Sequence, residues 1–171
     1  MGAGYTNYFV SSSANSGHEV RAQAWVLIRE NTDPYIPEGW SVVLKTDGDG
    51  TFAYDSPHWG SSTTVLNSHT DPLAPGNAKY AAYNTRNFDA VKACVGSLAN
   101  CLPVHAFDEP IQNAAALFDG PHRREGVIEG AWLNAFGATS QRTCAPQRPG
   151  FNTQCSGGNN ARWGFCAFYF T

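Results

Sequence analysis

Hydrophobic and polar residues alternate with a period of two through residues 18–30, HEVRAQAWVLIRE. One face of this stretch carries only aliphatic side chains, which are Val20, Ala22, Ala24, Val26 and Ile28. The other face is apolar in its middle and carries Arg21 and Arg29 near its ends. A repeat of two is that of a β-strand, so residues 18–30 are predicted to form a strand whose second face is covered only at its centre.

A second alternating stretch begins at Trp40 and runs into a cluster of turn residues. Asp47-Gly48-Asp49-Gly50 supplies residue types that tolerate positive φ, as the turn of a β-hairpin requires. The pattern predicts a hairpin over residues 40–54. The run from Asp47 to Thr51 is also similar to the start of a calcium-binding loop, but the twelfth position of such a loop would be His58 rather than glutamate. We therefore interpret the run as a hairpin turn.

Weaker patterns predict further strands. Residues 4–13, GYTNYFVSSS, are typical of a strand that ends in a serine-rich loop. Residues 161–170, ARWGFCAFYF, are aromatic on both faces, which predicts a strand in the middle of a sheet. The segment FDAVKACV, residues 88–95, fits either a strand or a helical turn, and residues 126–136 are similarly ambiguous.

One helix and two irregular segments complete the assignment. The helix is expected over residues 111–118, IQNAAALF, after Pro110 and before Gly120. Residues 56–78 have almost no periodicity and are predicted to form a long surface loop, and residues 31–38, with two prolines, form a linker. The expected fold class is α+β, mainly antiparallel β-sheet with few short helices and long loops.

Composition agrees with a loop-rich β protein of one domain. Of the 171 residues, 15% are charged and 13% aromatic, whereas roughly 25% are charged in ordinary soluble domains. The net charge is −3 and the basic residues are scattered, which argues against binding of nucleic acid through its phosphates. The longest apolar runs fall far short of the roughly 20 residues that a membrane helix needs, so no membrane span is expected.

Five cysteines carry the remaining compositional signal. Their spacing does not fit a zinc site. Cys94 and Cys101 flank a Gly-Ser turn, and Cys144 and Cys155 bracket a loop rich in proline and glycine, so two local disulfides are favoured over five reduced thiols. Four cysteines allow three pairings, among which the sequence does not choose. Cys166 is then either buried or paired with another chain.

Several segments together resemble the fibrinogen-like domain of ficolins, tachylectins and intelectins. Residues 39–59, GWSVVLKTDGDGTFAYDSPHW, are similar to the opening strand of that domain and its YDS-x-x-W segment. Residues 77–96, NAKYAAYNTRNFDAVKACVG, resemble its middle, and residues 149–166, PGFNTQCSGGNNARWGFC, its later GFN…ARxG strand. Residues 22–30, AQAWVLIRE, resemble its last strand. About four-fifths of the chain is placed in this way.

The order of these segments is circularly permuted relative to the family. Residues 1–171 are interpreted as a single domain in which residues 1–30 correspond to the C-terminal end, residues 31–38 are a linker, and residues 39–171 correspond to the beginning and middle. Permutation is physically permissible because the ends of a compact domain often lie close together. The calcium loop of the family has no counterpart here, so no metal and no cofactor is expected.

The resemblance implies an extracellular, secreted or cell-surface, lectin-like module that binds a glycan or an acetylated ligand without catalysis. Aromatic rings would stack on the ligand and amides would bind its hydroxyl groups. The candidate ligand-binding residues are Tyr5, Asn7, Tyr8, His18, Asn159, Asn160 and Trp163. The alternative interpretation is that the tyrosines and the tryptophan pack within strands and that Asn159-Asn160 forms a turn.

Two other polar clusters are interpreted as exposed loops. His105, Asp108 and Glu109 in VHAFDEP have the residue types of acid–base chemistry but are predicted to form a solvated turn. The run from His122 to Glu125 is expected to be a charged loop, with an anion site as the alternative. The sequence has no GxSxG, HExxH or P-loop motif, and no enzymatic activity is predicted.

A second functional hypothesis is a structural, self-assembling subunit of an extracellular fibre or coat. The odd cysteine, the aromatic strands at both ends and the low charge motivate it. In this homo-oligomer or filament, the terminal strands of one chain would complete its neighbour, since exposed strands are templates for pairing.

Overall fold

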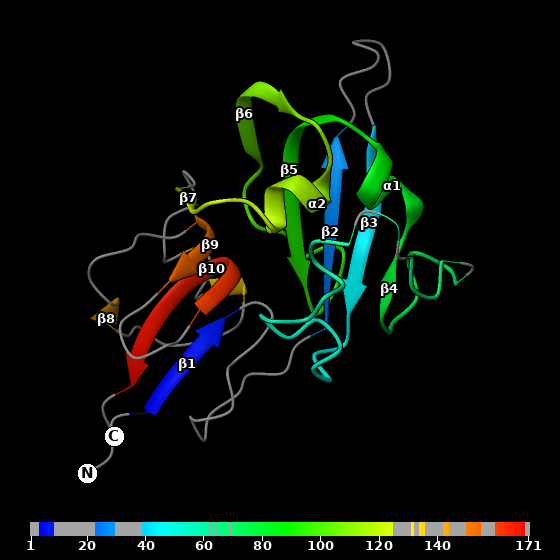
Figure 1. Ribbon diagram of the computed structural model, residues 1–171. Helices are drawn as coiled ribbons and strands as arrows, with labels where there is room; N and C mark the ends of the chain where they lie inside the picture. Colours follow the sequence, from blue (N-terminus) through cyan, green and yellow to red (C-terminus); the bar gives the residue numbers. More distant parts are fainter. Residues whose placement is uncertain are drawn as a thin grey trace.

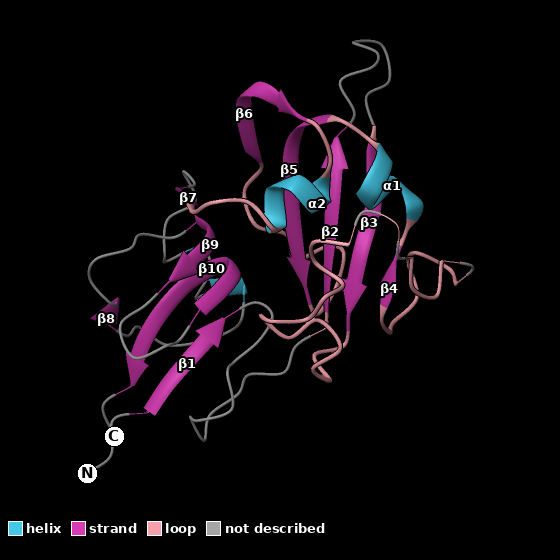
Figure 2. Cartoon of the chain, in the orientation of Figure 1, coloured by secondary structure: helices cyan, strands magenta, loops and turns pink. Residues whose placement is uncertain are grey.

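Two antiparallel sheets of five strands each make up the fold of the described residues (Figures 1 and 2). The structure is a computed structural model. It describes residues 4–8, 23–29, 39–61, 63, 65–68, 70–124, 131, 134–135, 142–143, 150–154 and 160–169. The linker at residues 31–38 lies outside them. Within the described residues, no helix is long and apolar enough to cross a membrane.

The first sheet, here called the central sheet, has β2 in its middle. Its strands in spatial order are β4 (Ala78–Lys79), β3 (Trp40–Thr46), β2 (Ala24–Arg29), β5 (Phe88–Val95) and β6 (His105–Ile111). Trp25 stands opposite Lys45 of β3 on one side and Cys94 of β5 on the other. The strand predicted over residues 18–30 is therefore confirmed for residues 24–29, and the ambiguous segment FDAVKACV is strand β5.

The two faces of β2 pack into different hydrophobic clusters. Val26 and Ile28 have no exposed surface and belong to the main core. Trp25 and Leu27, on the opposite face, form a smaller cluster with Cys94 and are flanked by Trp40. Arg29 at the end of β2 is exposed, as the sequence pattern predicted, whereas Arg21 lies outside the described residues.

The predicted hairpin over residues 40–54 is wrong in its second half. β3 ends at Thr46 and is followed by consecutive turns, and its partners are β2 and β4. Side-chain oxygens divert the chain, because Asp47 Oδ1 accepts the N–H of Asp49 and Asp49 Oδ1 accepts the N–H of Thr51. Such Asx turns compete with the backbone pairing of a strand.

Two buried lysines hold the long segment that follows. The Lys45 ammonium donates to the carbonyls of Asp71 and Ala74 at 2.7 and 2.9 Å. The Lys79 ammonium donates to the carbonyls of His58 and Ser61. Both side chains are at most 1% exposed. Residues 56–78 were predicted to form a surface loop, and this is wrong for their first part, since Trp59 is fully buried.

The second sheet, here called the terminal sheet, brings the first and last described strands together. It consists of β1 (Gly4–Tyr8), β10 (Asn160–Tyr169), β9 (Gly150–Gln154), β7 (Arg123–Arg124) and β8 (Arg142–Thr143). β10 has neighbours on both sides, which confirms its predicted central position. Gly4 stands opposite Tyr169. Chain ends that lie close together are common in compact domains, so the permuted order stays a prediction.

Two short helices pack on the inner face of the central sheet. They are α1 (Ala81–Thr85) and α2 (Ala114–Phe118). α2 begins later than predicted because Ile111 still belongs to β6 and the side chain of Asn113 caps the helix, accepting the N–H of Ala116 at 2.8 Å. In the ambiguous segment 126–136, the described residues Ala131, Asn134 and Ala135 are helical.

Phe118 joins the two sheets in one aromatic core. Its ring lies 5.2 Å from Trp59 and 5.9 Å from Tyr83, which belong to the central sheet side. It also lies 5.8 Å from Phe151 of β9 and 6.2 Å from Trp163 of β10. All five rings are fully buried. The two sheets therefore share a core.

Candidate functional site

Those residues proposed at the two ends of the chain that the structure describes lie in strands of the terminal sheet. Tyr5, Asn7 and Tyr8 lie in β1, where Tyr8 stands opposite Phe165. Asn160 begins β10 and stands opposite Gln154 of β9. His18 and Asn159 lie outside the described residues. The role of these residues in ligand binding therefore stays a prediction.

Trp163 lies in the hydrophobic core. Its side chain is fully buried and its ring stacks on Phe151, with centroids 4.9 Å apart and an interplanar angle of 25°. This burial favours the alternative interpretation, in which Trp163 is a core residue. Large aromatic residues are the main contributors to a core, and β10 is central in its sheet.

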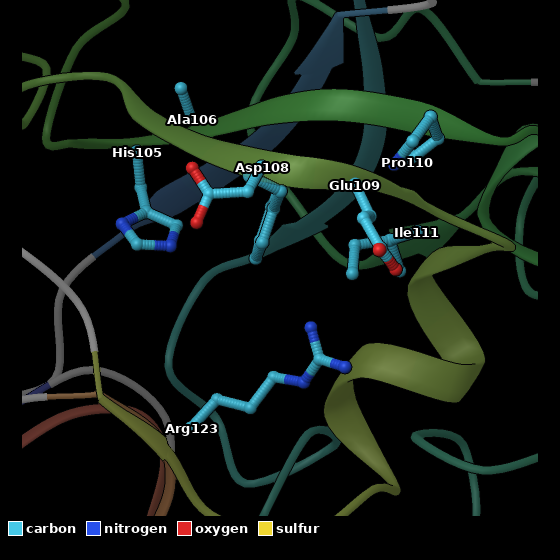
Figure 3. Close-up of a pocket in the computed structure, with 8 residues that line it drawn as sticks. His105, Ala106, Asp108, Glu109, Pro110, Ile111 and Arg123 are labelled. Atoms are coloured by element: carbon cyan, nitrogen blue, oxygen red, sulfur yellow. The ribbon is translucent and has the colours of Figure 1, made fainter.

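A groove lies instead between β6 of the central sheet and β7 of the terminal sheet (Figure 3). Its volume is about 570 Å³, within the range of small-molecule sites. Seven consecutive residues of β6 and one of β7 line it, namely His105, Ala106, Phe107, Asp108, Glu109, Pro110, Ile111 and Arg123. The segment VHAFDEP was predicted to be a solvated turn. The turn is wrong because the segment is mostly a strand, whereas the exposure of Asp108 and Glu109 is confirmed.

An irregularity in β6 explains why so many consecutive residues reach the groove. Ala106 pairs with Ala90 and Ile111 with Phe88, so residues 107–110 stand opposite Asp89 alone. Residues in excess on one strand bend it away from its partner. Pro110 has no N–H to contribute to the ladder, which favours this interruption. The bend lets Asp108 and Glu109, neighbours in sequence, line the same volume.

Aromatic rings fix the inner wall of the groove. The Phe107 ring lies edge-to-face against His105 at 4.6 Å and against Phe88 at 5.8 Å, and it is 5.9 Å from Phe151. Phe107 and His105 are half-buried. Burial lowers the pKa of His105 from its ordinary value of 6.5, so its imidazole is neutral near pH 7. The wall thus offers an apolar surface and a neutral imidazole.

The charged side chains of the groove are exposed and are not paired with one another. Figure 3 shows Asp108 and Glu109 projecting from β6 and Arg123 reaching toward them from the opposite side. Among the described residues, no ion pair links Arg123 to either carboxylate. Two carboxylates can accept hydrogen bonds and a guanidinium can donate them, so the groove can bind a ligand rich in hydroxyl groups.

The acidic side chains after β3, unlike those of the groove, are hydrogen-bonded to other described residues. The Asn77 amide donates to Asp47 Oδ1 at 3.0 Å and to Asp49 Oδ2 at 2.9 Å. The N–H of Thr51 is the largest cause of a lowered pKa of Asp49. In the described part of the chain, no group of three or more His, Cys, Asp or Glu side chains is placed to hold a metal ion. The run is a turn fastened by its own hydrogen bonds.

One of the two predicted disulfides is present. Cys94 at the end of β5 is bonded to Cys101. Cys144 and Cys155 lie outside the described residues, so their pairing stays a prediction. Cys166 lies in β10 opposite Asn7.

Comparisons with protein-family models, with curated proteins and with solved structures give no match to this chain. The kinship with fibrinogen-like domains therefore stays a prediction. The antiparallel α+β architecture stands on the structure itself.

The sequence pattern indicates the residues of the groove but not their combination. His105, Asp108 and Glu109 were assigned to one loop and Arg123 to another. The available signal was Pro110 beside two carboxylates in an extended stretch, which is typical of an edge strand. The proximity of β6 and β7 depends on the packing of two sheets and has no local signature.

Proposed function

We propose that this chain is a non-catalytic, extracellular carbohydrate-binding module whose ligand lies in the groove between β6 and β7. The observation that carries the proposal is the lining of the groove, where Asp108, Glu109 and Arg123 surround a volume beside Phe107. Hydroxyl groups of a sugar pair with carboxylates and guanidinium groups, and the apolar face of a sugar ring packs on an aromatic ring. The volume suits one or two sugar residues.

The disulfide supports the proposed extracellular location. Bonds such as Cys94–Cys101 form and persist mainly in oxidising compartments. The aromatic core and the low content of charged residues agree with a small rigid binding module. The acetyl preference implied by the resemblance rested on residues near the chain ends, and the groove gives it no support of its own.

A glycan array, followed by calorimetric titration of the best ligands, tests this function. Binding is expected in the presence and absence of EDTA, because the groove lining needs no metal to contact hydroxyl groups. Glu109→Ala and Arg123→Ala should each weaken binding about tenfold, the effect of losing a charge-assisted hydrogen bond. Asp55→Ala, an exposed carboxylate outside the groove, is the matched control. Absence of sugar binding, or binding that ignores both groove variants, would contradict the proposal.

Self-assembly into an extracellular fibre or coat is the second candidate. One observation favours it, since β1 is at the edge of the terminal sheet in the order of the described strands. β10 is flanked on both sides, so a neighbouring chain would have to add to β1. Light scattering and electron microscopy at high concentration, with and without dithiothreitol, test it. A protein that stays monomeric under both conditions would argue against this candidate.

A further inference from the structure

We infer that the groove between β6 and β7 selects a saccharide that carries a free ammonium group over its neutral and N-acetylated counterparts. The inference rests on the proposed function and narrows it to one class of glycan. It follows from the number, position and pairing of the charges in the groove.

The groove carries an excess of negative charge. Asp108 and Glu109 supply two carboxylates and Arg123 supplies one guanidinium. His105 adds no positive charge near neutral pH, because burial keeps its imidazole neutral. A positive group on the ligand would therefore be attracted more strongly than a neutral one, while an acidic sugar would be repelled by the carboxylates.

The bend in β6 places the two carboxylates on the same volume. In a regular strand, neighbours in sequence point to opposite faces. Here both Asp108 and Glu109 line the groove, and both are exposed. An ammonium group has three N–H donors and no acceptor, so it can donate to two carboxylates at once. A neutral hydroxyl group has one donor and would leave one carboxylate without a partner.

The rest of the lining fits the remainder of such a sugar. Arg123 lies across the groove from the carboxylates and can donate to ring or hydroxyl oxygens (Figure 3). Phe107 is held in place by the rings of His105, Phe88 and Phe151, so it offers a fixed apolar contact. An acetyl group on the nitrogen would remove the positive charge and two of the three donors.

Three β-1,4-linked disaccharides that differ only at carbon 2 test the inference. They are the disaccharides of glucosamine, of N-acetylglucosamine and of glucose. Calorimetric titration near neutral pH and at low salt, where exposed charges are least screened, gives the three affinities. We expect the glucosamine disaccharide to bind about tenfold more tightly than either other disaccharide, the size of one additional charge-assisted contact.

Groove variants should move this preference in opposite directions. The double variant Asp108→Asn with Glu109→Gln should reduce the preference to about twofold or less, since it removes the charge and keeps the shape. Arg123→Gln should increase the preference, because a competing positive charge is gone. Asp55→Asn should leave it unchanged. Circular dichroism of each variant establishes that it is folded. A preference that Arg123→Gln lowers would overturn the inference.

The outcomes separate this inference from the proposed function. If none of the three disaccharides and no other glycan binds, the proposed function fails. If the neutral or acetylated disaccharide binds as tightly as the glucosamine disaccharide, this inference fails and the proposed function stands. If n-butylamine binds as tightly as the glucosamine disaccharide, the groove recognises an amine and not a sugar, and the saccharide class is overturned.

Discussion

Two acidic segments of this chain have similar compositions but different surroundings. At Asp47 and Asp49, the carboxylates accept hydrogen bonds from backbone N–H groups and from the Asn77 amide. At Asp108 and Glu109, the carboxylates are exposed, line a groove and form no ion pair with Arg123 among the described residues. The first segment resembles a calcium loop in sequence yet is structural, and the second was interpreted as a plain turn yet is the stronger candidate site.

The difference shows that hydrogen-bond pairing, and not residue type, separates a structural polar cluster from a binding site. A carboxylate whose lone pairs are already used by the chain gains little from a ligand, whereas an unpaired one exchanges only water. The same distinction applies to the cations. Lys79 is buried and committed to two carbonyls, while Arg123 is exposed in the groove. Five predictions test this contrast.

Replacement of Lys79 should have the largest effect on stability. Lys79→Met removes the ammonium group that donates to the carbonyls of His58 and Ser61 and should lower the free energy of unfolding by about 3 kcal/mol. Urea denaturation measures this loss. Lys92→Met is the matched control, because the half-buried Lys92 ammonium only covers the Trp40 ring at 4.4 Å, and it should cost less than about 1 kcal/mol.

The burial of Lys79 should also make the stability of the protein depend on pH. Burial lowers the pKa of Lys79 from 10.5 to about 8. Between these values the unfolded chain binds more protons than the folded chain, so stability should rise with pH across this window. Burial also raises the pKa of Tyr83 above 10.0, which reverses the trend at the upper end. The free energy of unfolding, plotted against pH from 7 to 10, should rise more steeply for the wild type than for Lys79→Met. Equal slopes would contradict the assignment.

Replacement of Arg162 should have the next largest effect on stability, because this residue connects the terminal sheet to elements of the central sheet. Its guanidinium donates to the carbonyls of Tyr54 and Phe118, both at 2.7 Å. Arg162→Met should lower the free energy of unfolding by about 2 kcal/mol. Asp119→Asn, which alters only a partly exposed ion pair at 3.6 Å, should cost about 0.5 kcal/mol or less. Similar losses in both variants would show that the ion pair, and not the carbonyl contacts, is what matters.

Asn77 tests the acidic turn directly. Asn77→Ala removes the amide that joins Asp47 and Asp49 and should cost about 1 kcal/mol. Asn77→Asp should cost more, because it adds a third negative charge, and millimolar calcium should recover part of the loss. Thermal unfolding with calcium and with EDTA measures both. A wild-type protein that calcium stabilises would show that the turn is itself a metal site.

The carboxylates of the groove should matter least for folding. Asp108→Asn and Glu109→Gln should each change the free energy of unfolding by less than about 0.5 kcal/mol, since both side chains are exposed and unpaired with Arg123. Chemical denaturation measures this small change. A loss of about 2 kcal/mol in either variant would mean that the groove is as structural as the turn after β3.

The sequence predicted those elements that depend on local pattern. Alternation identified β2 and β3, aromatic residues on both faces placed β10 in the middle of a sheet, and short spacing identified the Cys94–Cys101 bond. The helix predicted from residue 111 begins at Ala114 in the structure, because Asn113 caps its N-terminus.

The sequence did not predict features that depend on distant parts of the chain. The turn after β3 is closed by Asn77, thirty residues from Asp47. The sequence does not show that Trp163 packs against Phe151 and Phe118, which lie far from it in the chain. The groove requires the edges of two separate sheets to meet, and alternation within β6 is concealed by its bend.

The pairing of β1 with β10 has a mechanical consequence. Gly4 stands opposite Tyr169 at one end of an antiparallel ladder. Tension applied between these two residues would load the hydrogen bonds one pair at a time, starting from that end, instead of shearing all of them together. The terminal sheet should therefore open at low force while the central sheet, whose strands lie outside this line of tension, keeps its groove-lining strand in place.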